Sequence, residues 1–487
     1  MTDALLDELD REAEAFAEAV EREQYLNGSG QKDRVELQAI YRRHARLFSR
    51  ETIDALARAD AADERRRELR RLAVEGYLDA AADELTEAIA LRETADAVEW
   101  DGAAVPYRSV APLVRNEPDA ARRHALERRL AAVTAAQNAL RERRWDVLHG
   151  RANELGYGSY RQLIEDVGGL DIAALAATLG RFLRDTEAPY RDALATRLRA
   201  IGIDPAFAEK SDLAFLFREP AFDRWFAADR LLETYAETMR GLGLADQAQA
   251  RIILDVEPRP TKSPRAFCSA LRIPDEIYLV ISPQGGESDY GAILHEGGHA
   301  QHFAHVGRSL PFALRGLGDN SVTEGFAFVL EHIMAIPAWL ERHLGMQDPG
   351  AYLAAHRFNR LYMVRRYAAK LLYEAELHAR DEVRGGQKRY ADLLTAATGV
   401  RYQPEDYLAD VDDAYYCARY LRAWIFDAQV RALLRQRFGD GWFASPAAGA
   451  KLVELWSRGQ RYDAPELLRR EGLAGLDPAA LVSDLAG

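Results

Sequence analysis

Apolar residues recur at helical spacing along almost the whole chain of 487 residues, and the breaks between the periodic segments are short. This pattern predicts a mainly α-helical protein. We expect the helices at about 3–25, 33–48, 51–69, 72–92, from Pro118 to Gly156, and at 171–200. A loop without regular structure is expected at WDGAAVPY, residues 100–107.

Two runs rich in β-branched and aromatic residues differ from this helical background. RIILDV at 251–256 and EIYLVIS at 276–282 together predict a small sheet. A chain of this length predicts either two lobes or one large helical assembly with a cleft. The sequence contains no repeat, no low-complexity linker and no clear boundary, so residues 1–487 are treated as one unit.

The charge balance argues against nucleic acid as the main partner. The chain has 64 Lys and Arg against 77 Asp and Glu, a formal net charge of −13, whereas phosphate binding needs a basic surface. No apolar stretch is long enough to cross a bilayer, and the acidic start lacks the pattern of a secretory signal. Cys268 and Cys417 are too few for a disulfide framework. We therefore expect a cytoplasmic protein whose metal ligands are histidines and carboxylates.

The segment LHEGGHAQHFAH, residues 294–305, contains four of the eleven histidines. His295 and His299 are four residues apart on an expected helix, so about 40° and 6 Å separate them and both imidazoles can reach one ion. Glu296 points to the side, where it can take a proton from an attacking water, as in the H-E-x-x-H pattern. A surface helix whose polar residues match that pattern by chance is the alternative.

The two glycines between these histidines need an explanation. Gly297 and Gly298 each cost about 1 kcal/mol relative to alanine inside a helix. Something should compensate for that cost. We expect another helix or a substrate backbone to approach so closely that a side chain would be in the way.

The third metal ligand is a choice between His305 and Glu324. The longer pattern H-E-x-x-H-x-x-G-x-x-H needs a glycine where this chain has His302, so we expect the helix to continue and to turn His305 away from the metal. Glu324 falls on the first turn of an expected capped helix at 319–333, where the helix dipole alone could also favour an acid. Two histidines and a glutamate, with water in the fourth position, are the usual catalytic zinc set.

One zinc ion per chain is therefore expected, and its predicted ligands are His295, His299 and Glu324. We expect His302 and His305 behind these ligands or at the surface.

HEGGHAQHFAHVGRSLPFALRGLGDNSVTEG resembles the metal segment of the helical zinc peptidases that include thimet oligopeptidase, oligoendopeptidase F and angiotensin-converting enzyme. The resemblance extends to RAFCSALRIPDEIYLVIS, which is similar to the strand lining the peptide groove in that group. It covers about 265–425, the expected zinc-site core. It implies a nearly all-helical ellipsoid of two lobes around a deep channel, with a small sheet beside the zinc.

YLADVDDAYYCARYLRAWIFDAQV, residues 407–430, is rich in aromatic residues, and such a stripe is usually core. The resemblance implies that a tyrosine here donates to the oxyanion of the tetrahedral intermediate, and Tyr420 is the best match. Asp410 stands where a histidine that assists the substrate is common in the group. Tyr415 or Tyr416 is a candidate replacement for that histidine, and Tyr416 and Asp410 are the expected substrate contacts.

The expected function is that of a zinc metallopeptidase acting on short, unfolded oligopeptides. Zinc polarises the carbonyl and the water, Glu296 moves the proton to the leaving amine, and Tyr420 stabilises the oxyanion. A peptidyl-dipeptidase is one alternative, and it would need a cationic pocket for the C-terminal carboxylate. A zinc-holding peptide-binding protein is another, although a non-catalytic site has no need for Glu296.

Overall fold

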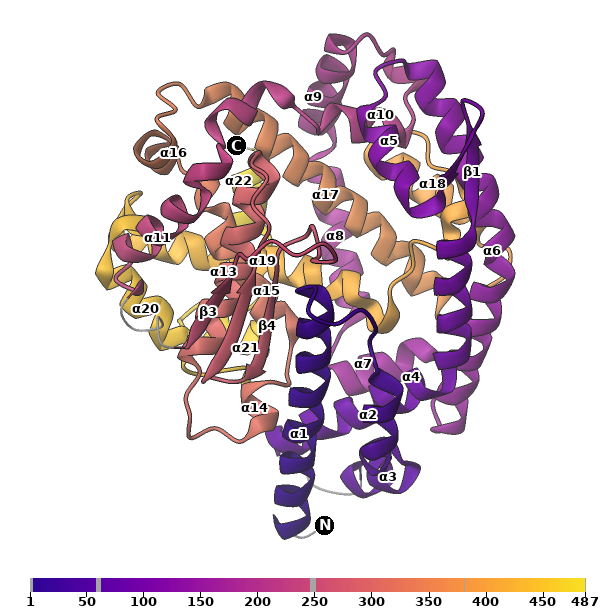
Figure 1. Cartoon of the computed structure of the whole chain (residues 1–487), viewed down its shortest axis with the longest axis vertical. Helices are drawn as coiled ribbons and strands as arrows, with labels where there is room; N and C mark the ends of the chain where they lie inside the picture. The colour runs from indigo at the N-terminus through magenta and orange to yellow at the C-terminus, as the bar shows by residue number, and fades with distance from the viewer. Residues whose placement is uncertain (1–2, 58–62, 246–250, 381, 487) are drawn as a thin grey trace. The chain divides into compact units, whose positions relative to one another are not determined.

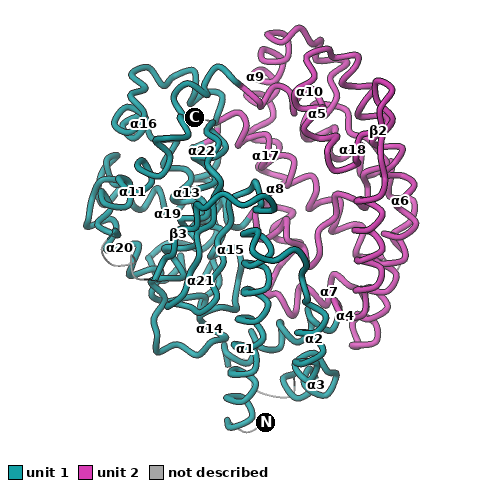
Figure 2. The backbone as a smooth tube through the Cα atoms, viewed as in Figure 1, with its two compact units in different colours: residues 1–77, 220–356, 422–484 teal, residues 78–219, 357–421, 485–487 magenta. Residues whose placement is uncertain are grey.

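The computed structural model describes residues 3–57, 63–245, 251–380 and 382–486. The chain divides into two compact units, each assembled from segments that are distant in sequence (Figure 2). Unit 1 comprises Met1–Tyr77, Pro220–His356 and Arg422–Asp484, and unit 2 comprises Leu78–Glu219, Arg357–Leu421 and Leu485–Gly487. The chain passes between the units at Glu219–Pro220 and inside α4 (Glu64–Ala95), α17 (Gly350–Leu377), α19 (Tyr416–Phe438) and α22 (Ala479–Ala486).

Unit 1 is mostly helical and carries the histidine-rich segment. Its other helices are α1 (Asp3–Gly28), α2 (Leu37–Arg43), α3 (Arg50–Ala57), α11 (Leu231–Gly241), α13 (Glu287–His305), α14 (Phe312–Arg315), α15 (Asn320–Glu331), α16 (Pro337–Leu344), α20 (Pro446–Trp456) and α21 (Ala464–Arg470). Its main core surrounds α13, with fully buried side chains such as Ile293, Val329 and Trp456. Burial of apolar surface on this scale is the main force that holds the helices together.

A three-stranded sheet lies against α13 in unit 1 (Figure 1). Its strands, in the order β3-β5-β4, are β3 (Ile252–Asp255), β5 (Glu276–Val280) and β4 (Phe267–Arg272). The two expected β-rich runs form β3 and β5, which pair in parallel, and β4 is a further strand antiparallel to β5. The sheet lies between two helices, because Ile277 and Leu279 of β5 join the core around α13 while Tyr278 stacks on Tyr25 of α1.

Unit 2 is built from helices and one hairpin. Its helices are α5 (Val110–Asn116), α6 (Ala120–Glu154), α7 (Tyr160–Gly168), α8 (Ile172–Asp185), α9 (Glu187–Ala200), α10 (Lys210–Leu216) and α18 (Gln387–Thr398). The hairpin pairs β1 (Ala97–Trp100) with β2 (Ala103–Pro106), where a loop was expected. Asp101 and Gly102 at its tip both have positive φ, as an Asp-Gly two-residue turn requires, and this turn signal was overlooked.

Four expected helices were also wrong in their bounds. The helix expected at 33–48 is the shorter α2, followed by a separate 3₁₀ turn at Ala45–Phe48. The helices expected at 51–69 and 72–92 are instead α3 and the longer α4, which runs without a break past residue 71. The single helix expected at 171–200 is interrupted at Thr186 and forms α8 and α9. Pro189 explains this break, because it has no N–H to donate to the preceding turn.

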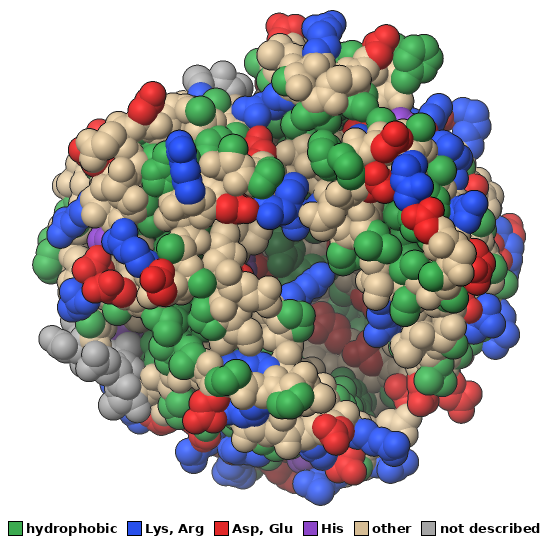
Figure 3. Space-filling model, turned by 45° about the horizontal axis from the view of Figure 1, so that its top comes forward, with side chains coloured by type: hydrophobic (Ala, Val, Ile, Leu, Met, Phe, Trp, Pro, Cys, Tyr) green, Lys and Arg blue, Asp and Glu red, His purple; other side chains and the backbone are tan. Residues whose placement is uncertain are grey.

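The mainly α-helical class with a small sheet is confirmed. Within the described ranges, no helix combines the length and the apolar character that crossing a membrane would need. Figure 3 shows acidic and basic side chains interspersed over the face in view.

Candidate metal centre

The two motif histidines lie on the same face of α13, one helical turn apart. The centroids of the His295 and His299 rings are 4.9 Å apart, and the rings are nearly perpendicular at 82°. This is the arrangement expected from a spacing of four residues. Both rings can therefore direct one nitrogen to the same point.

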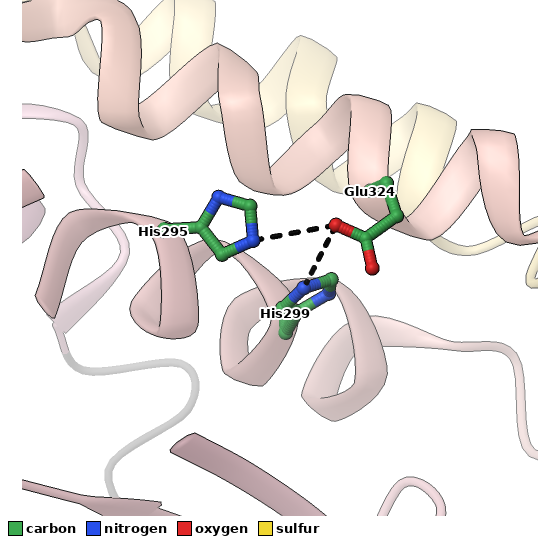
Figure 4. Close-up of side chains that lie close together, drawn as sticks. All are labelled: His295, His299 and Glu324. Carbon is green, nitrogen blue, oxygen red and sulfur yellow. Dashed lines mark ion pairs between the residues drawn. The ribbon is translucent and has the colours of Figure 1, made fainter. Parts of the chain in front are cut away.

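Glu324 meets these two imidazoles from the neighbouring helix α15. The Asp319 side chain caps α15 by accepting the backbone N–H of Ser321 at 3.0 Å. Glu324 Oε2 lies 3.3 Å from Nε2 of His295 and 3.7 Å from Nε2 of His299 (Figure 4). One ligand atom from each of the three residues lies within 4.8 Å of the others. Two nitrogens and one carboxylate oxygen thus converge.

Close packing around α13 accounts for the two glycines of the motif. A Cβ atom on Gly298 would lie 2.6 Å from the Cα atom of Ala327 in α15, and one on Gly297 would lie 2.4 Å from the Tyr235 ring of α11. The expected close approach of another helix is confirmed at Gly298. At Gly297 a side-chain ring occupies the space instead. The missing side chain at Gly298 is what allows α15 to present Glu324 to the histidines.

The outer nitrogens of both imidazoles are held by α15 as well. Nδ1 of His295 is 2.8 Å from Oε2 of Glu331, and Nδ1 of His299 is 3.0 Å from Oγ1 of Thr323. Such contacts fix the orientation of a metal-binding imidazole and leave Nε2 available as the ligand. Sequence reasoning missed both partners. The available signal was the spacing of Glu324 and Glu331, which lie seven residues and two turns apart on one helix face.

The centre favours a positive charge. Burial disfavours the charged form of His295, but hydrogen bonds to Glu324 and Glu331 outweigh burial and raise its pKa to about 10. Burial acts against ionisation of Glu324 too, yet the two histidines hold its pKa far below the usual range. When both imidazoles are neutral, as metal binding requires, the carboxylates of Glu324 and Glu331 give the centre a net negative charge. A divalent cation would balance that charge.

Glu296 lies outside the converging set. Its Oε2 accepts the backbone N–H of Cys268, in strand β4, at 2.9 Å. Burial raises the pKa of this carboxyl, so the group is more basic than an exposed glutamate. The sideways direction expected for Glu296 places it between the centre and the sheet.

His302 and His305 do not join the centre. The helix continues through both, as expected, and α13 ends at His305. We expected these two histidines either behind the ligands or at the surface. Both are buried, which rules out the surface position. His302 is fully buried between Phe303 and Phe326, and burial lowers its pKa to about 3. Nδ1 of His305 donates a hydrogen bond to the Gln301 carbonyl at 2.8 Å.

The other expected site residues belong to unit 2. Tyr416 begins α19 and is partly exposed, and its ring centroid is 5.0 Å from that of Tyr420. Asp410 is held by Arg366, whose Nη2 is 2.5 Å from Oδ1, and by the Tyr390 hydroxyl at 2.8 Å from Oδ2. This ion pair gives Asp410 a structural role within its own unit. Roles of Tyr416, Tyr420 and Asp410 with a substrate stay predictions.

A second group of potential ligands in unit 2 is less suited to a metal. Glu374, Asp412 and Cys417 also place one ligand atom each within 4.8 Å of the others. Lys370 Nζ lies 2.8 Å from Asp412 and already supplies a positive charge there, and the Cys417 thiol donates to Glu374 at 3.0 Å. Burial raises the pKa of Glu374 to about 8 and disfavours the thiolate that a metal would need.

The chain matches no family model and no curated sequence. Solved structures do share its fold. One is the crystal structure of "a putative oligoendopeptidase F from Bacillus anthracis str. Ames", with a TM-score of 0.65 and 13% identity over 95% of this chain and 83% of that chain. A second X-ray structure, of a "putative Oligoendopeptidase F", gives a TM-score of 0.63 and 16% identity over 98% of this chain and 84% of that chain. Both likenesses concern the fold.

Proposed function

We propose that this protein is a zinc-dependent peptidase that hydrolyses peptide bonds in short, unfolded peptides. The observation that carries the proposal is the convergence of His295, His299 and Glu324, with Glu296 one residue from the first ligand. The fold shared with two structures described as oligoendopeptidase F supports the substrate class.

The residues present fit a zinc ion. Two imidazole nitrogens and one carboxylate oxygen are the ligand types of catalytic zinc sites, which leave a position open for water or substrate. Glu331 and Thr323 contact Nδ1 of the two imidazoles and so orient the rings with Nε2 available for a metal. When bound, zinc supplies Lewis-acid activation of a water and of the peptide carbonyl.

Glu296 is the proposed general base. Its carboxylate is fixed by the Cys268 N–H, so it is held in one orientation beside the centre. A raised pKa makes it a better acceptor for the proton of the attacking water, which it then passes to the leaving amine. A carboxylate that is not a ligand has no evident use in a centre that only binds zinc.

Tyr420 is proposed to donate a hydrogen bond to the oxyanion that forms as the carbonyl is attacked. The resemblance of residues 407–430 to the helical zinc peptidases supports this role. A Tyr420→Phe variant keeps the ring and loses only the donor. We expect it to retain zinc and to lose roughly 10²-fold in rate, the usual effect of removing one such donor.

Mass spectrometry of products from a mixed library of peptides of different lengths tests the proposal. We expect zinc-loaded protein to cleave short unfolded peptides and to leave folded proteins intact, and a chelator should abolish the cleavage. Products shortened only by two residues from the C-terminus would indicate a peptidyl-dipeptidase. Peptides that bind but stay uncleaved at full zinc occupancy would refute the peptidase proposal and favour a binding protein.

A further inference from the structure

Unit 2 contains a cavity of about 290 Å³ that the proposed peptidase chemistry does not use. Helices α5, α6 and α10 form its walls together with residues 403–410. Val114, Leu130 and Ala131 give it an apolar side. Five charged side chains, which are Glu127, Lys210, Arg366, Asp406 and Asp410, give it a strongly polar side.

Four of these charges already neutralise one another. Lys210 Nζ is 2.7 Å from Asp406 Oδ2, and Arg366 Nη2 is 2.5 Å from Asp410 Oδ1. Two cations therefore face two aspartates. Glu127 remains as the fifth charge and leaves the cavity with one negative charge when it is ionised.

Glu127 is buried and shares its nearby cation with another carboxylate. The residue is 5% exposed, and its Oε2 accepts the backbone N–H of Ser211 at 3.1 Å. The positive charge of Lys210 acts on it, but Lys210 is paired with Asp406. Burial outweighs the charge of Lys210 and raises the pKa of this carboxyl. A buried carboxylate in this state is costly unless a positive group reaches it.

The Ser211 hydroxyl next to it is also unsatisfied. Ser211 is 1% exposed and lines the cavity, and its Oγ has no hydrogen-bond partner within the described part of the chain. The hydroxyl lies close enough to the Glu127 carboxyl to help lower its pKa. Two oxygens on one wall, one of them charged, can thus accept hydrogen bonds from a donor in the cavity.

We propose that this cavity binds the primary ammonium group of a small organic amine. An ammonium has three N–H donors, which suit the Glu127 carboxylate and the Ser211 hydroxyl, and a short alkyl chain suits the apolar wall. A divalent metal fits less well, because Lys210 and Arg366 line the same space and repel it. The single surplus charge matches a monovalent cation.

Isothermal titration calorimetry of the full-length protein with n-butylammonium chloride tests this proposal. We expect saturable binding of one amine per chain, and no binding of n-butanol or butyrate, which lack the positive charge. Glu127→Gln should weaken amine binding by about tenfold or more, the effect of removing one charge-assisted hydrogen bond. Glu154→Gln is the matched control, because Glu154 lies at the exposed end of the same helix α6, and it should bind as the wild type does.

A second variant keeps the test decisive if Glu127→Gln does not fold. Lys210→Met removes a competing cation from a side chain that is 35% exposed, so it should tighten amine binding several-fold. No amine binding at millimolar concentration would overturn the proposal. Equal binding of n-butanol, calcium binding that depends on Glu127, or weaker binding by Lys210→Met would overturn it as well. None of these variants alters the metal centre.

Discussion

Each histidine of the metal centre uses its two nitrogens for different purposes. Nε2 of His295 and of His299 faces Glu324, while Nδ1 is held by Glu331 or Thr323. The proposed ligands and the side chains that hold them thus come from two helices, α13 and α15. Removing a ligand should therefore abolish metal binding without disturbing distant parts of the chain.

The ligand assignment predicts which substitutions remove zinc. His295→Ala, His299→Ala and Glu324→Ala should each lose the metal or bind it far more weakly, because three protein ligands are the minimum of a catalytic zinc site. His305→Ala is the control from the same helix and should keep about one zinc per chain. Elemental analysis after dialysis measures the occupancy. Full occupancy in Glu324→Ala together with loss in His305→Ala would reverse the assignment.

At the scale of elements, the contact between α13 and α15 decides whether the ligands meet. Gly298 faces the backbone of α15, whereas Gly291 on the same helix has nothing within 4 Å of where a Cβ would lie. The two glycines therefore make a matched pair. A change to alanine raises the helix propensity at both positions, but only at Gly298 does the added methyl group clash with a neighbour.

Gly298→Ala should destabilise the protein by about 1–3 kcal/mol, the usual cost of forcing an extra methyl group into a packed contact. It should also weaken zinc binding, because α15 must move away. Gly291→Ala should instead stabilise the protein by about 0.5–1 kcal/mol through helix propensity. Urea unfolding of both variants measures the difference. Equal effects of the two substitutions would show that the close contact is not significant.

The sequence predicted those elements whose signal is local. Helical periodicity placed α1, α6, α13 and α15, and fixed helix geometry placed His295 beside His299. The β-rich runs predicted β3 and β5, whereas β4 was indicated only by the resemblance of RAFCSALRIPDEIYLVIS to a groove-lining strand. Glu331 and Thr323 were not assigned, because their roles depend on how α15 packs across α13. Gly298 indicated that a helix approaches closely here, but not which helix or which of its side chains meet the imidazoles.

At the scale of the whole molecule, buried histidines link stability to pH. Burial lowers the pKa of His302 to about 3, while an exposed histidine in the unfolded chain titrates near 6.5. The unfolded state therefore takes up a proton first as the pH falls. The stability that His302 contributes is fully present above about pH 6.5 and is lost progressively as the pH falls towards 3.

His302→Leu should remove this dependence. Between pH 7 and pH 5, the unfolding free energy of the wild type should fall by about 2 kcal/mol more than that of the variant. Urea unfolding at both values, with a chelator present to exclude metal effects, measures the difference. If the unfolding free energy of wild type and variant changed by the same amount between pH 7 and pH 5, His302 would take up its proton equally in the folded and unfolded states.

The proposed peptidase activity depends most directly on Glu296. Glu296→Gln preserves the size of the side chain and leaves the three zinc ligands in place, so zinc and peptide binding should stay near the wild-type values. The amide cannot accept the proton of water, and turnover should fall by about 10²- to 10⁴-fold.

The decisive measurement is the rate of peptide hydrolysis by wild type and Glu296→Gln at equal zinc content, with peptide binding measured in parallel. We expect equal zinc occupancy, similar peptide affinity and a loss of turnover of at least about 10²-fold in the variant. Cleavage by Glu296→Gln at the wild-type rate would show that Glu296 is not the general base.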